Sequence, residues 1–171
     1  MTTLRRQARS YALQLLYRIE VEPEASAAAN PAGEGLARER FWADTRASRK
    51  ARELANDLVD SVVAHRSDLD AALESVMEQW KLSRLPVMVR LVLRLAACEL
   101  IVQVTQPPPA ILNEAMELTR TYMDEESVKF VNSVLDRLLQ HQKGQGGEGR
   151  EDSTALDSKP LPPPPRVAEG T

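Results

Sequence analysis

The sequence contains very few cysteine, histidine and aromatic residues. Cys98 is the only cysteine among 171 residues, so the chain cannot form an intramolecular disulfide, and a reducing compartment, the cytoplasm, is the simplest expectation. His65 and His141 are the only histidines, and neither stands at metal-ligand spacing from Cys98. We therefore expect no metal site and no other bound cofactor.

Long hydrophobic runs are also missing. The most apolar stretch, "LVLRLAACELIVQV" at 91–104, is interrupted by Arg94 and Glu99 and is too short to cross a bilayer. The basic start, "MTTLRRQARSYALQLLYRIE", has helically spaced apolar residues and no small-residue cleavage site, so it is not typical of a signal peptide. We expect no association with a membrane.

The chain has no strong excess of either charge. A net charge of -3 and a pI near 5.5 argue against a protein that coats nucleic acid by bulk charge. Any nucleic-acid site must therefore be a local basic patch. Residues 1–20 fit that description, because Arg5, Arg6, Arg9 and Arg18 stand there against Glu20 alone.

Signals for catalysis are weak. The stretch "GQGGEGR" at 144–150 has no preceding strand pattern and no Lys-Ser/Thr pair, so it is not typical of a phosphate-binding loop. Glu114 and Glu117 share a helix face, but no candidate nucleophile or cofactor loop accompanies them. We expect that the protein is not an enzyme.

Helical periodicity dominates the chain, and no run alternates with period two over the length of a strand. We therefore predict an all-α helical bundle. Helices are expected at 4–19, 48–64, 68–80, 86–103 and 111–122, and a sixth helix is capped by "DEES" at 124–127 and ends near residue 140. The helix at 86–103 is apolar nearly all round, which predicts that neighbours bury it on several sides.

Two segments lack this periodicity. Residues 22–46 mix Pro, Gly, Ala and charge, and we interpret them as a mobile connection in which Phe41 and Trp42 dock on the core. After Gln140 the composition becomes rich in Gly and Pro, which predicts a disordered tail at 141–171 in which "PLPPPPR" adopts polyproline II. Residues 1–140 would then form one helical domain.

The first helix carries a second pattern besides its apolar stripe. Arg5, Arg6 and Arg9 fall on the side opposite that stripe, together with Leu13 and Tyr17. A face that is merely solvated has no need of a leucine and a tyrosine beside its arginines. The pattern therefore favours a functional face.

Four blocks in this order resemble the NusB family of bacterial transcription antitermination factors. They are "RRQARSYALQLLY" at 5–17, "LVLRLAACEL" at 91–100, "ILNEAMEL" at 111–118 and "SVKFVNSVLDRLL" at 127–139. The resemblance implies a NusB-like fold of two packed three-helix units. It also implies a function, which is to bind the single-stranded boxA element of RNA together with the small-subunit ribosomal protein NusE. The pair would help a transcription elongation complex to transcribe ribosomal RNA operons processively.

The resemblance also assigns residues by position. The RNA-binding set would be Arg5, Arg6, Arg9, Tyr17, Lys129, Phe130 and Asn132, which agrees with the cations and aromatic rings that hold single strands. Phe130 fits a core position equally well. Val89 and Arg90 would lie in the helix that faces NusE, and Val89 stands where the family often carries an acid, so it supplies no ionic contact.

Two other interpretations stay open. The chain can be a helical adaptor that binds only protein. It can also be a stand-alone recognition module for ribosomal RNA, related to the N-terminal domain of ribosomal RNA cytosine methyltransferases, although it has no βαβ pattern and no Gly-rich turn for a methyl donor. A homodimer that covers the arginine-bearing face is compatible with each of these interpretations.

Overall fold

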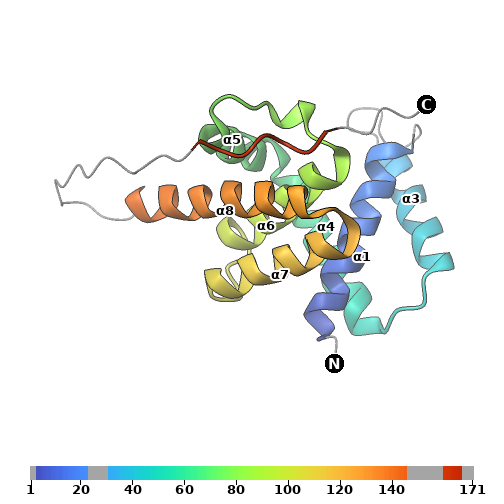
Figure 1. Cartoon of the computed structure of the whole chain (residues 1–171). Helices are drawn as coiled ribbons and strands as arrows, with labels where there is room; N and C mark the ends of the chain where they lie inside the picture. The colour runs from blue at the N-terminus through green and yellow to red at the C-terminus, as the bar shows by residue number, and fades with distance from the viewer. Residues whose placement is uncertain (1–2, 23–30, 146–159, 167–171) are drawn as a thin grey trace. The chain divides into compact units, whose positions relative to one another are not determined.

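The computed structural model describes residues 3–22, 31–145 and 160–166. Within these ranges the chain forms α-helices and one 3-10 helix but no strand, which confirms the all-α prediction (Figure 1). The helices are α1 (Leu4–Val21), α3 (Pro31–Asp44), α4 (Arg49–Ala64), α5 (Arg66–Met77), the 3-10 helix η1 (Leu82–Arg84), α6 (Val87–Ile101), α7 (Pro108–Tyr122) and α8 (Glu125–Gln145). No described helix is both long and apolar enough to cross a membrane.

The chain divides into two compact units, Met1–Arg66 and Ser67–Thr171. The described part of the first unit contains the three helices α1, α3 and α4, and that of the second contains the four helices α5 to α8. The resemblance to the NusB family implied three helices in each unit. The difference arises because α3 was not predicted and α5 lies in the second unit.

In the first unit, α1 packs against both α3 and α4. Side-chain oxygens cap two of these helices: Thr3 Oγ1 accepts from the Arg6 backbone N–H at 3.3 Å, and Ser48 Oγ accepts from that of Ala51 at 3.2 Å. Each cap satisfies a backbone donor that has no partner inside the helix. The predicted starts of these two helices, at residues 4 and 48, therefore agree with the structure to within one residue.

Helix α3 lies within residues 22–46, which were interpreted from the sequence as a mobile connection. Much of that segment is helical, and residues 23–30 lie outside the described residues. Phe41 and Trp42 are buried, as predicted, and Trp42 Nε1 donates to Asn56 Oδ1 on α4 at 3.0 Å. The Tyr11 ring on α1 meets Trp42 edge-on at 5.8 Å. Trp42 thus anchors α3 to α1 by an aromatic contact and to α4 by a hydrogen bond.

In the second unit, α6 is buried on nearly all sides, as predicted, and packs against α7 and α8. Its one buried arginine, Arg94, is paired with a carboxylate on α5. The Arg94 Nε and Nη2 atoms donate to Asp70 Oδ1 and Oδ2 at 2.7 and 3.0 Å. This bidentate pair compensates the cost of burying a guanidinium and ties α5 to α6.

Local backbone and side-chain contacts set the end of α5 and the start of α8. Helix α5 ends at Met77 rather than at the predicted Trp80, because Glu78 adopts a φ of 49° in the left-handed region. Asp124 caps α8, since its Oδ1 accepts from the Ser127 hydroxyl at 2.7 Å and backbone N–H at 2.8 Å. These two hydrogen bonds lower the pKa of Asp124 below its ordinary value.

The structure describes only part of the tail that was predicted to be disordered at 141–171. Residues 141–145 continue α8, and residues 160–166 lie against the second unit without forming a helix or strand (Figure 1). Residues 146–159 and 167–171, where the tail was also predicted to be disordered, lie outside the described residues. The structure therefore gives part of the proline-rich segment a defined place.

Candidate nucleic-acid interface

The first turn of α1 carries two of the predicted RNA-binding arginines. Arg5 is exposed and Arg6 is half-buried, and the turn contains no acidic residue. A helix N-terminus bears a partial positive charge, which disfavours nearby cations and favours anions such as phosphate. Arg5 and Arg6 therefore carry their charges at a helix end that favours anions, and each also has an interaction partner within the protein.

Arg9 does not share that surface. It is only 4% exposed, and Leu13, which was predicted beside it on the same face, is fully buried. Helix α1 packs against both α3 and α4, so its buried surface is wider than a single apolar stripe. The expected face of three arginines is therefore corrected to Arg5 and Arg6.

Tyr17 lies further along α1 and is 41% exposed. An exposed aromatic ring can stack on an unpaired base, as the assignment of this residue requires. The neighbouring Arg18 is paired with Glu22 at 2.6 Å and so contributes little net positive charge. Tyr17 thus presents a ring to solvent beside a neutral ion pair.

On α8 the predicted residues separate into surface and core. Lys129 and Asn132, three residues apart on one face of the helix, are both exposed. Phe130 is fully buried, so the choice between a core and an RNA-facing position is settled in favour of the core. A ring without exposed area cannot stack on a base, and Phe130 is removed from the candidate interface.

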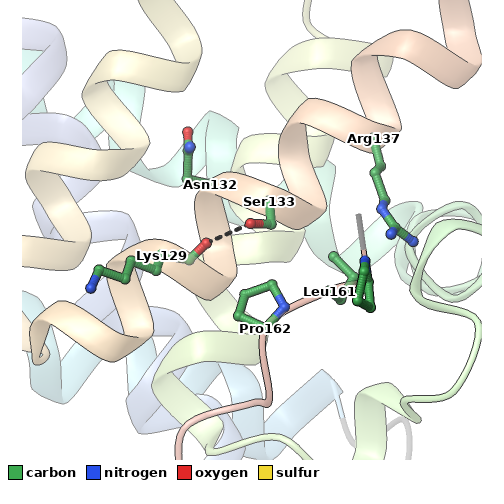
Figure 2. A pocket seen from close by; sticks show the side chains of 7 residues that line it. Lys129, Asn132, Ser133, Arg137, Leu161 and Pro162 are labelled. Atoms are coloured by element: carbon green, nitrogen blue, oxygen red, sulfur yellow. Dashed lines mark hydrogen bonds between the residues drawn. The ribbon is translucent and has the colours of Figure 1, made fainter. Parts of the chain in front are cut away.

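The same face of α8 borders a pocket of about 350 Å³ that sequence reasoning missed. Figure 2 shows side chains of α8 on one side of this pocket and the proline-rich segment on the other. The lining residues are Lys129, Asn132, Ser133, Arg137 and Pro160 to Pro162. The four-residue steps from Lys129 to Ser133 to Arg137 were the available signal for this helix face. Nothing comparable marks Pro160–Pro162.

Arg137 is held in place by the end of α5. Its Nη1 atom donates to the Val76 carbonyl at 3.4 Å and lies 3.5 Å from Glu78 Oε1. Because Glu78 is well exposed, this ion pair is largely screened by water. The guanidinium therefore has a fixed position at the edge of the pocket.

The two residues assigned to the partner interface, Val89 and Arg90, differ in how exposed their side chains are. Val89 is 1% exposed, so its side chain does not lie on the surface, and the assignment is corrected. Arg90 is half-buried, and its Nη1 atom donates to the carbonyls of Ser83 and Leu85 at 3.4 and 3.3 Å. These bonds hold the segment around η1 against the start of α6.

Metal binding has no support in the part of the chain that the structure describes. No group of three or more His, Cys, Asp or Glu side chains gathers there in a way that could hold a metal ion. The candidate residues are therefore two arginines and one exposed ring in the first unit, and a lysine and an amide in the second.

Comparisons with known proteins give one consistent result. A model of the NusB family matches residues 6–140. The transcription antitermination protein NusB of Anaeromyxobacter dehalogenans (strain 2CP-1) is 40% identical over 141 residues, which are 81% of this chain and 92% of that protein. The NusB protein of Syntrophus aciditrophicus is 32% identical over 168 residues, which are 96% of this chain and 91% of that protein.

Solved structures agree with the sequence comparisons. The solution structure of NusB from Aquifex aeolicus matches with a TM-score of 0.69 and 27% identity over 89% of this chain and 98% of that one. A crystal structure of the antitermination factors NusB and NusE in complex with double-stranded RNA matches with a TM-score of 0.68 and 30% identity. That match covers 82% of this chain and 99% of the other.

Proposed function

This chain belongs to the NusB family of transcription antitermination proteins, and from this premise we propose that it binds single-stranded boxA-type RNA together with ribosomal protein NusE. In this proposal the pair joins a transcription elongation complex and supports processive transcription of ribosomal RNA operons. The observation that carries the proposal is the family match over residues 6–140, which spans both compact units. The related complex of NusB, NusE and RNA supports the choice of partners.

The exposed side chains have the chemistry that a single strand requires. Arg5 and Lys129 can each neutralise a phosphate, the Tyr17 ring can stack on a base, and the Asn132 amide can donate to and accept from a base edge. We propose these four residues, with the half-buried Arg6, as the RNA-binding set. Arg9 and Phe130 are left out because both are buried.

The number of cations limits the affinity of the chain alone. Neutralising one phosphate on a single strand contributes about -0.7 to the slope of log Kobs against log salt. Arg5, Arg6 and Lys129 together therefore give a slope of roughly -2, which is shallow, and the net charge of -3 opposes RNA at long range. We propose that NusE supplies the additional surface that makes binding tight.

For the contact with NusE we propose Arg90 rather than Val89. Arg90 keeps part of its side chain accessible at the start of α6, while its bonds to the carbonyls of Ser83 and Leu85 fix its position. A side chain that is already ordered loses less conformational entropy on binding.

Fluorescence anisotropy tests the proposal. A labelled boxA strand, a scrambled strand of equal composition and a boxA duplex are titrated with the full chain at two salt concentrations, with and without NusE from the same cell. We expect the boxA strand to bind most tightly, and only when NusE is present. Binding of NusE without any RNA affinity would refute the proposal and favour an adaptor that binds only protein. Equal binding of duplex and single strand would refute the preference for single strands.

A further inference from the structure

The segment Pro160–Arg166 rests on the surface of the second unit although it forms no helix or strand. Pro165 is buried and Leu161 is half-buried, whereas Pro163 and Arg166 are exposed. In Figure 1 this segment, coloured red, runs beside α5 and α8. The segment thus has an inner side that contacts the protein and an outer side that faces solvent.

Two hollows lie along the inner side of the segment. The larger one, of about 350 Å³, lies between Pro160–Pro162 and the face of α8 that carries Lys129 and Asn132 (Figure 2). The smaller one, of about 30 Å³, lies between Leu161 and the end of α5 at Met77–Trp80. Pro160 and Leu161 both border the two hollows, and of these Leu161 is the half-buried one.

The chemistry of this groove suits a proline-rich segment. Proline fixes φ near -65°, so such a segment loses little backbone entropy when it docks, and proline-rich ligands commonly bind grooves that contain aromatic rings. Trp80 supplies a half-buried ring next to Leu161. The groove is formed by residues of α8 and by Met77–Trp80 at the end of α5, and the Arg137 side chain of α8 donates to the Val76 carbonyl of α5.

Charge does not hold the segment in place. Pro160–Arg166 contains no carboxylate, while the larger hollow is lined by the cations Lys129 and Arg137. Apolar burial must therefore provide the attraction. Of the two cations, Lys129 keeps its capacity to attract an anion, whereas Arg137 is already paired with Glu78. A strand of RNA would need the same surface.

We propose that Pro160–Arg166 is an intramolecular ligand of this groove and that it competes with RNA for the face of α8 bearing Lys129 and Asn132. The docking itself is argued from the burial of Leu161 and Pro165 and from the residues that line the two hollows. The competition rests on the proposed RNA-binding function. Release of the segment would expose Lys129 and Asn132 fully, so the proline-rich segment lowers RNA affinity by occupying part of the RNA surface.

The test uses full-length chains that differ at one position of the segment. Leu161→Asp places a charge between the two hollows, and Pro163→Asp adds the same charge on the outer side as a matched control. Docking is measured without RNA, as the rate at which a thiol introduced by Ser133→Cys reacts with maleimide. Mass spectrometry identifies the labelled peptide, which separates this thiol from the buried Cys98.

We expect Leu161→Asp to raise the labelling rate about tenfold, since loss of leucine burial shifts a docking equilibrium by about that factor. Pro163→Asp leaves the labelling rate unchanged. In chains without the added cysteine and with NusE present, Leu161→Asp tightens boxA binding by roughly two- to tenfold, the factor by which docking had reduced the competent population. Pro163→Asp leaves that affinity unchanged.

Each other result overturns a defined part of the proposal. An unchanged labelling rate in Leu161→Asp would refute docking, whatever the RNA result. A raised labelling rate together with unchanged or weaker boxA binding would refute the competition. If no variant binds RNA even with NusE, the proposed function fails, and the labelling rates still decide whether the segment docks.

Discussion

The arginines of α1 allow stability and RNA binding to be separated by substitution. Arg5 and Arg6 stand in the first helical turn, where cations oppose the helix dipole by about 0.3 to 1 kcal/mol each. The double variant Arg5→Ala/Arg6→Ala should therefore keep its free energy of unfolding within about 1 kcal/mol of the original or raise it slightly. Arg9 is 4% exposed and has interaction partners, so Arg9→Ala should lower that free energy by about 1 to 3 kcal/mol.

RNA binding should respond in the opposite way. With NusE present, the slope of log Kobs against log salt should become shallower by about 1.4 in the double variant, because two phosphate contacts are lost. The slope for Arg9→Ala should stay the same as long as the protein is folded. Urea unfolding followed by circular dichroism gives the stabilities, and anisotropy at several salt concentrations gives the slopes. The reasoning is refuted if Arg9→Ala is as stable as the original chain and reduces the slope.

Three further predictions concern the packing and the pH dependence of stability. Asp70→Ala should lower the free energy of unfolding, measured by urea unfolding, by about 3 kcal/mol, because the buried Arg94 guanidinium loses the Asp70 carboxylate. Adding Arg94→Met to this variant should recover most of the loss. Phe130→Ala should lower the free energy of unfolding by about 3 to 5 kcal/mol, because it removes a fully buried ring. Phe130→Leu should stay folded and bind boxA RNA normally. Weaker RNA binding by a folded Phe130→Leu would contradict the core position of Phe130. The pKa of Asp124 is lowered in the folded state by Ser127, so its contribution to stability is complete above the ordinary aspartate pKa and is lost as the pH falls through the lower folded value. Asp124→Asn keeps the helix cap but has no titrating charge. As the pH is lowered below about 4, the urea midpoint of this variant should therefore fall less than that of the original chain. Parallel plots of urea midpoint against pH for the two proteins would contradict this.

Most helices could be predicted because their apolar residues repeat at helical spacing. Helix α3 could not be, since Pro31, Gly33 and Gly35 weaken the signal at its start. Only the four-residue step from Ala37 to Phe41 indicates a helix, and both residues are buried. Packing against α1 stabilises α3 more than its own propensity does, and a single sequence does not display that packing.

The site was predicted less well than the fold, for a related reason. A helical wheel gives the direction of a side chain but not the neighbours that cover it. Lys129 and Asn132 lie on the surface as the assignment required, whereas Arg9, Phe130 and Val89 are covered by other parts of the chain. The sequence of the short proline-rich segment carries no periodic pattern that would indicate where it lies, so only the structure could reveal its position.

Photo-cross-linking tests the central claim, that the exposed residues of both units contact one RNA strand, most directly. A boxA strand substituted with 4-thiouridine is irradiated with the NusE-bound full chain, and the linked peptides are identified by mass spectrometry. The account predicts links to the peptide of α1 that contains Tyr17 and to the peptide of α8 that contains Lys129 and Asn132. Links confined to NusE, or to helices of this chain other than α1 and α8, would contradict it.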